Sequence, residues 1–136
     1  IIRMKRPDVI VTTDPTVYWY GTRAINHPDH RAIGVSTFEA VFPTARDRLN
    51  FPELERDEGL DVHKTPLVYV AGAAEPTVKV DVSEYVETKI NSLRCHVSQI
   101  ADMEAMAQRV KERMLDTFAP EDGPRYVEQF RVIRLG

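Results

Sequence analysis

The feature that most constrains the fold is a pair of short, apolar, β-branched runs with one amphipathic helical segment between them. The first run, residues 9–13, has the Val/Ile/Thr composition of a buried strand in a parallel sheet, and the second is the Leu-Val-Tyr-Val run at 67–70. The helix should begin at Pro28, because proline is favoured at the first helical position, and end at Phe42 before a second proline. Strand, helix and strand in this order predict an α/β fold.

The other segments are assigned from periodicity and turn residues. Loops are predicted at 14–26 and 43–65, and a strand with one wet face at 78–82. Within 84–118 we expect either one long helix capped by Ser83 or two helices, the second of them capped by Asp102. Gly123-Pro124 should turn the chain, and a last strand or extended segment is predicted at 126–135. The helix that begins at Pro28 should present an apolar face made of Ile33, Thr37, Phe38, Val41 and Phe42.

Length and composition bound the class of protein. The 136 residues suit one domain, 1–136, and a charged fraction of 29% with 43% hydrophobic residues is typical of a globular chain. The net charge of −3, with no basic patch, predicts no nucleic-acid partner, and no apolar run is long enough for a membrane span. Cys95 is the single cysteine and is expected to be buried in a helix, and we expect a cytoplasmic protein with no signal peptide.

The segment that could carry chemistry is Asn26-His27-Pro28-Asp29-His30, which opens the predicted helix. Ligands of open α/β sheets bind beyond the carboxyl ends of the strands, and two histidines three residues apart can reach one centre. Asp29 could hold one imidazole by a hydrogen bond. The spacing alone favours surface or capping histidines over a metal role, and a zinc site needs about three protein ligands.

The other histidines do not complete such a site. His63 falls in a predicted loop and His96 on a predicted helix, and neither has ligand-like spacing to the Asn26–His30 segment. The chain also lacks a phosphate-binding glycine loop, a nucleophile elbow and a Cys-x-x-Cys pair.

The residues around this segment resemble the second half of the PIG-L/LmbE family of N-deacetylases. The matching segments, which run in order from Pro7 to Arg131, are Asn26 to Arg31, Gly34, Ala40 to Ala45, Phe51 to Leu54, Gly59-Leu60, His63-Lys64, Val80 to Val82, and Lys89 through Leu93 to His96, Ser98 and Gln99. The resemblance implies a Rossmann-like fold and a zinc-dependent hydrolase, in which water activated by the metal removes an N-acetyl group from a glucosamine-containing or related amino sugar.

The resemblance also implies roles for individual residues. His30 corresponds to a zinc ligand, and His27 to the histidine that stabilises the tetrahedral intermediate or protonates the leaving amine. Asp29 corresponds to the aspartate that orients that histidine. Apart from the resemblance, the place of Asn26, Arg23 and Trp19 in the predicted loop at 14–26 leads us to expect that they border the substrate.

The chain departs from the family in one large respect. The family's other motif, Ala-His-Pro-Asp-Asp, supplies two zinc ligands and the general base, and it does not occur in this sequence, which starts at Ile1. We therefore expect a C-terminal portion of the fold that lacks the first βαβ unit, completed by an N-terminal half in the same protein or in a companion chain. A degenerate, non-catalytic module that binds a sugar or a partner, and a metal phosphohydrolase, are the alternatives. The sequence leaves open whether the chain forms a homo-oligomer.

Overall fold

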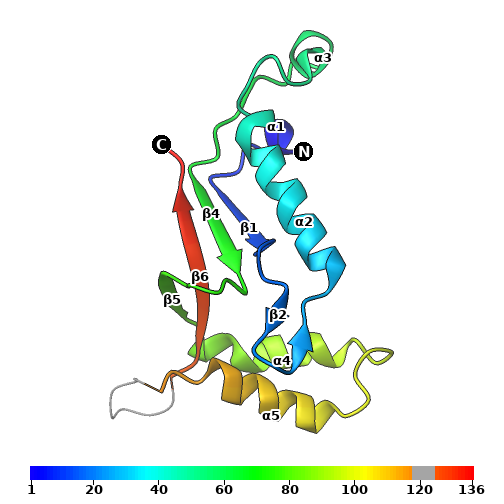
Figure 1. Cartoon of the computed structure of the whole chain (residues 1–136), viewed down its shortest axis with the longest axis vertical. Coiled ribbons are helices and arrows are strands. Elements are labelled where there is room, and N and C mark those ends of the chain that lie inside the picture. Colours follow the sequence, from blue (N-terminus) through cyan, green and yellow to red (C-terminus); the bar gives the residue numbers. More distant parts are fainter. Residues whose placement is uncertain (118–124) are drawn as a thin grey trace. The chain divides into compact units, whose positions relative to one another are not determined.

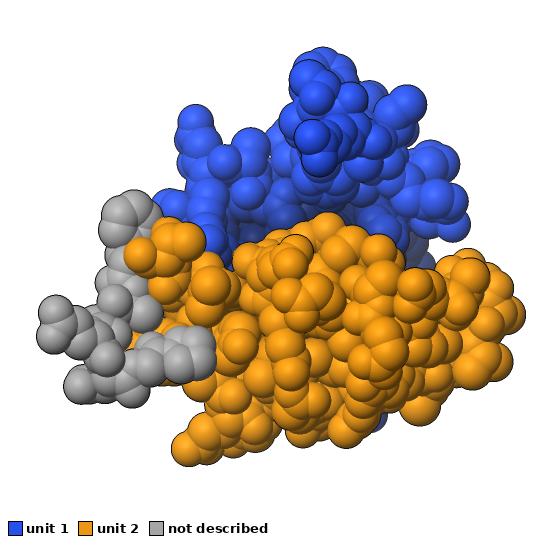
Figure 2. All heavy atoms as spheres, turned by 90° about the horizontal axis from the view of Figure 1, so that it is seen from below, with its two compact units in different colours: residues 1–78, 129–136 blue, residues 79–128 orange. Residues whose placement is uncertain are grey.

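The computed structural model describes residues 1–117 and 125–136, so the predicted turn at Gly123-Pro124 lies outside the described residues. The chain divides into two compact units, shown in different colours in Figure 2: residues 1–78 with 129–136, and residues 79–128. The single domain expected over 1–136 stays a prediction. Among the described residues, no helix combines the length and the apolar character that crossing a membrane requires.

The main sheet has the strand order β1-β4-β6-β5 (Figure 1). Its strands are β1 (Val9–Thr13), β4 (Leu67–Ala71), β5 (Val78–Asp81) and β6 (Val127–Arg134). β1 and β4 are parallel, with Val9 opposite Leu67 and Thr13 opposite Ala71, whereas β4 and β6 are antiparallel. A parallel pair with a helical crossover is the signature of an α/β sheet, so the predicted fold class is confirmed.

One face of this sheet packs against α2 (Pro28–Glu39) and the turn that follows it. Val68 and Val70 alternate along β4 towards this face and are buried, and with Val41 they form the centre of a cluster that also includes Phe38 and Ile10. β1 itself is less buried than predicted, since Val9 and Val11 on the opposite face are exposed.

The predicted apolar face of α2 is only partly correct. The helix meets β1 through the buried Gly34, and Ile33, which lies about 100° further round the helix, is exposed. The helix ends at Glu39, earlier than predicted, and an irregular turn at Ala40–Thr44 follows. Phe42 has extended dihedral angles in that turn (φ −144°, ψ 121°), so its ring leaves the helical stripe and is exposed.

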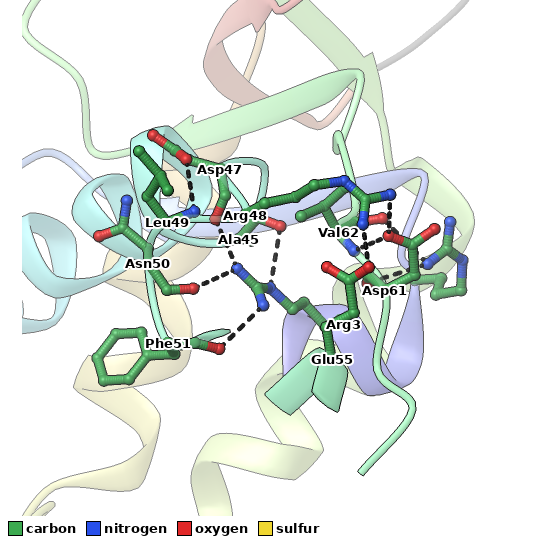
Figure 3. A network of polar contacts seen from close by, with 11 residues as sticks. Arg3, Ala45, Asp47, Arg48, Leu49, Asn50, Phe51, Glu55, Asp61 and Val62 are labelled. Atoms are coloured by element: carbon green, nitrogen blue, oxygen red, sulfur yellow. Dashed lines mark hydrogen bonds and ion pairs between the residues drawn. The ribbon is translucent and has the colours of Figure 1, made fainter. Parts of the chain in front are cut away.

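Residues 43–65 are not a free loop, because Arg3 anchors them. Arg3 lies in α1 (Ile2–Lys5) and is 5% exposed, and α3 (Pro52–Arg56) interrupts the loop. The Arg3 guanidinium donates hydrogen bonds to five main-chain oxygens at distances of 2.7 to 3.3 Å, which belong to Thr44, Ala45, Asp47, Asn50 and Phe51. Figure 3 shows the last four of these residues around Arg3. A buried cation is therefore paired with five carbonyl dipoles instead of a carboxylate.

In its described part, the second unit contains two α-helices, α4 (Val86–Arg94) and α5 (Met103–Met114). The buried side chains that pack together between them are Val86, Ile90, Ala107 and Met114. Asp102 caps α5, because its carboxylate accepts a hydrogen bond of 2.9 Å from the Ala105 amide.

Two expectations for this unit are wrong. Ser83 is not a helix cap: it begins a 3-10 turn (Ser83–Tyr85), and its hydroxyl donates to Asp81 and accepts from the Tyr126 amide. Cys95 is exposed instead of buried, because α4 ends at Arg94 and leaves the cysteine in the turn beyond it.

Candidate functional site

The candidate site is the beginning of α2. His27 is the residue before the helix, as the sequence predicts, and its Nδ1 accepts a hydrogen bond of 3.2 Å from the Asp29 amide. This bond satisfies one of the amide groups that have no partner within the first helical turn, and Pro28 has no amide hydrogen to satisfy. The local sequence therefore explains why the helix begins here.

This end of α2 lies against the carboxyl end of β1. The Thr13 hydroxyl, on the last residue of β1, donates to the main-chain oxygen of His30. The same contact leaves no room at Gly34, where an added Cβ atom would lie 2.7 Å from the Thr13 oxygen and 3.1 Å from the Pro15 nitrogen. The two histidines are thus placed at the sheet edge where open α/β folds bind ligands.

The two imidazoles lie close together and face solvent. Their ring centroids are 5.8 Å apart with the planes inclined by 50°, and the His27 side chain is 62% exposed. Among the described residues, no hydrogen bond engages the ring of His30. The predicted proximity of the two rings is confirmed, and the His30 ring has nitrogen atoms free for a ligand.

The position of Asp29 differs from the expectation. Its carboxylate oxygen lies 3.6 Å from His27 Nδ1, which is too long for a hydrogen bond, and that nitrogen already accepts from the Asp29 amide. The proton of a neutral His27 ring is therefore on Nε2. In this geometry Asp29 fixes the tautomer of His27 through its main chain, and its carboxylate acts on the ring only through charge.

The described part of the chain does not assemble a complete metal site. It contains no group of three or more His, Cys, Asp or Glu side chains placed to hold one ion. His63 is used elsewhere, with its Nε2 2.9 Å from the Pro7 oxygen, and His96 is exposed in the turn after α4 rather than on a helix as predicted. His30 fits as one imidazole ligand of a zinc ion, and the other protein ligands would have to come from outside the described residues.

Asn26 has a structural position. It is 2% exposed, its Nδ2 donates to the Val17 oxygen at 2.8 Å, and its amide donates to the Tyr18 oxygen at 2.9 Å. Among the residues that the structure describes, its Oδ1 atom has no hydrogen-bond partner. The predicted substrate contact of Asn26 is therefore not visible in this structure, and the residue ties the preceding loop to the beginning of α2.

That loop folds into a small hairpin that was not predicted. Its strands are β2 (Trp19–Tyr20) and β3 (Ala24–Ile25), paired antiparallel with Trp19 opposite Ile25. Trp19 and Arg23, both predicted to border the substrate, line a hollow of about 260 Å³ on this hairpin together with Gly21, Thr22, Ala24 and Ile25.

Sequence reasoning missed Arg31 as a supporting residue. Its guanidinium lies 4.5 Å from the centre of the Tyr18 ring, and its Nη1 donates to the Asn26 main-chain oxygen. Arg31 follows His30 directly, so one side chain connects the first turn of α2 with the base of the hairpin. Its partners are a ring thirteen positions away and a carbonyl group, neither of which has a sequence signature.

Two comparisons with known proteins find a similarity to deacetylases. No protein-family model matches the chain. The chain is 29% identical over 134 residues to a diacetylchitobiose deacetylase of Thermococcus kodakarensis, covering 98% of this chain and 48% of that protein. It is also similar to the solved structure of an N,N'-diacetylchitobiose deacetylase from Pyrococcus horikoshii bound to an inhibitor, with a TM-score of 0.74 and 28% identity over 98% of this chain and 48% of the other.

Both similarities extend over nearly the whole chain, whereas the chain spans about half the length of each relative. That proportion agrees with the expectation that the sequence corresponds to a portion of such a protein. The chain is therefore similar to diacetylchitobiose deacetylases over nearly its whole length, and it has the LmbE-like α/β fold of the deacetylase structure that it matches.

Proposed function

We propose that this chain supplies one side of the active site of a zinc-dependent deacetylase, which removes an N-acetyl group from an amino sugar such as diacetylchitobiose. The observation that carries the proposal is the pair of exposed imidazoles of His27 and His30 at the beginning of α2 and the carboxyl end of β1. The similarity to diacetylchitobiose deacetylases over 98% of the chain supports the substrate class.

His30 would be this chain's metal ligand, and further ligands and the general base would come from the other half of the protein. A bound zinc ion acts as a Lewis acid and lowers the pKa of water. The hydrogen bond from Thr13 to the His30 main chain holds the first turn of α2 against the strand, which limits where the His30 ring can lie. An imidazole held in one position loses less conformational freedom when it binds an ion.

His27 would act on the substrate oxygen. With Nδ1 occupied by the Asp29 amide, Nε2–H is the donor that remains available. This donor suits an oxyanion that develops on the carbonyl oxygen of the substrate amide better than transfer of a proton to the leaving amine, which would require an imidazolium ion. The hydrogen bond that Nδ1 accepts from the Asp29 amide would polarise the ring and strengthen the Nε2–H donor as that oxyanion forms.

The test is acetate release from diacetylchitobiose by the complete protein that contains this chain. Loss of one such hydrogen-bond donor in His27→Ala should lower kcat by about 10²- to 10³-fold. His30→Ala should lower both activity and zinc content. His96→Ala is the matched control, because His96 is exposed and its ring makes no hydrogen bond among the described residues. Full deacetylation together with a full zinc content in His30→Ala would overturn the assignment.

A non-catalytic module that binds a sugar or a partner is the second candidate. It is favoured by the lack of any group of three metal-binding side chains among the described residues. The two proposals differ in a simple measurement: tightly held zinc and acetate release support the enzyme, and sugar binding without either supports the module. We also propose a cytoplasmic location, an N-terminal half in the same protein or in a companion chain, and a homo-oligomer.

A further inference from the structure

The β2–β3 hairpin exposes an unusual amount of aromatic and apolar surface beside the candidate site. Trp19 is 69% exposed, Tyr18 56%, Tyr20 46% and Ile25 85%. Aromatic side chains grouped on a surface in this way often mark a binding site. Because Ile25 and His27 are separated by one residue, the exposed group lies next to the proposed catalytic histidine in the chain.

The hairpin is short, but the surrounding contacts hold it in place. Two strands of two residues each are not stable alone. Asn26 fixes the base of the hairpin through its bonds to the Val17 and Tyr18 oxygens, and the Arg31 guanidinium packs on the Tyr18 ring. Both anchors belong to the segment that starts α2, so the hairpin keeps a defined position relative to His27.

The hollow on this hairpin has the chemistry of a carbohydrate subsite. Trp19 offers a broad apolar ring against which the C–H face of a sugar can stack. Arg23 offers five N–H donors, and in the part of the chain that the structure describes its guanidinium makes no hydrogen bond or ion pair. The volume of about 260 Å³ is below the ~300 Å³ at which pockets for drug-sized ligands begin, so it suits one ring rather than a whole oligosaccharide.

The distance between Trp19 and His27 is short enough for the second sugar ring of an oligomer to reach the hairpin. Trp19 pairs with Ile25, and residues paired in this way have Cα atoms roughly 5 Å apart. Two further steps along the chain reach His27, so the Cα atoms of Trp19 and His27 lie within about 13 Å of each other. An oligomeric amino sugar with one ring at His27 can therefore extend a second ring towards the hairpin.

We propose that Trp19 and Arg23 form a subsite for the sugar ring adjacent to the reactive one in an N-acetylated amino-sugar oligomer. The indole of Trp19 stacks on the ring, and Arg23 donates hydrogen bonds to its hydroxyl or acetamido oxygens. This inference rests on the proposed function, because it assumes a substrate of more than one sugar ring. The subsite sets how the oligomer is oriented and takes no part in bond cleavage.

The test uses Trp19 itself, which is the only tryptophan of the chain. The tryptophan fluorescence of the 136-residue chain is titrated with diacetylchitobiose, with N-acetylglucosamine and with cellobiose as a disaccharide that has no acetamido group. Diacetylchitobiose should give a saturable change. Arg23→Ala should weaken the apparent Kd by about tenfold, the change expected on losing one charge-assisted hydrogen bond. Arg109→Ala, an exposed arginine of α5, is the matched control and should leave the titration unchanged.

A second variant separates this subsite from the proposed reaction. His30→Ala should leave the fluorescence titration as it is in the unaltered chain, even where it abolishes deacetylation. If diacetylchitobiose binds by calorimetry with no change in fluorescence, or if the change survives Arg23→Ala, the subsite is wrong and the deacetylase proposal stands. If Trp19 emission shifts to the blue with protein concentration in the absence of sugar, the hairpin is an interface between copies of the chain, and the subsite is again wrong.

Discussion

Gly34 offers the sharpest test of how α2 is placed against β1, because two effects of known size oppose each other there. A Cβ atom at this position would lie 2.7 Å from the Thr13 oxygen and 3.1 Å from the Pro15 nitrogen. Both are main-chain atoms, so they cannot rotate aside, and a forced fit of this kind costs about 2 to 3 kcal/mol. Alanine in a helix is favoured over glycine by about 1 kcal/mol. Gly34→Ala should therefore lower the free energy of unfolding by about 1 to 2 kcal/mol.

The assay is urea unfolding followed by circular dichroism. Ala32→Gly is the matched control, because Ala32 is exposed in the same helix, and it should cost about 1 kcal/mol through helix propensity alone. A Gly34→Ala protein that is more stable than the unaltered chain would refute the close contact. It would also remove the argument that α2 is pressed against the carboxyl end of β1, on which the position of His30 depends.

Three further predictions concern the contacts that support the two units. Arg3→Met should destabilise the chain by about 3 kcal/mol, since it leaves buried carbonyl groups without a donor, and limited proteolysis should then cut within residues 43–65 first. Asp102→Ala should cost about 1 kcal/mol by removing the cap bonded to the Ala105 amide, measured by thermal unfolding, and an unchanged Tm would show that the cap is not important. Hydrogen bonds from the Ser83 amide and hydroxyl lower the pKa of Asp81, so the stability that this carboxylate contributes is complete above about pH 4 and is lost as the pH falls through its lowered pKa. Asp81→Asn should therefore flatten the acid limb of the stability profile, and an identical limb in both proteins would count against that role.

The elements that could be predicted are those whose cause is local. The beginning of α2 follows from the proline at its first position, and the parallel strands β1 and β4 follow from their β-branched composition. Asp102 is recognisable as a possible cap because its carboxylate acts on an amide only three residues away. These signals need no knowledge of tertiary packing.

The elements that could not be predicted depend on distant partners. Arg3 is held by carbonyl groups 41 to 48 positions away, and a carbonyl group is present at every residue, so no residue type marks its partners. The apolar periodicity predicts helices that include Phe42 and Cys95, but both helices end before these residues. The periodicity misleads because it continues past the residue where the backbone turns. The hairpin at Trp19 to Ile25 is two residues long on each side, too short for an alternation to be visible.

In the candidate site, the sequence identified the two histidines and their proximity but not the hydrogen-bond pattern. The expected bond between the Asp29 carboxylate and the His27 ring is replaced by a bond from the Asp29 amide. That difference decides which nitrogen of His27 carries the proton, and hence which step of the proposed reaction it can assist. It follows from the backbone angles at the helix start, which residue spacing does not specify.

The measurement that bears most directly on the proposed function is the zinc content of the complete protein, determined by elemental mass spectrometry after dialysis. We expect one tightly held zinc per active site, its loss in His30→Ala, and its retention in His96→Ala. A zinc content that does not depend on His30, or a protein that releases acetate from diacetylchitobiose with no metal bound, would contradict the proposal of a zinc-dependent deacetylase.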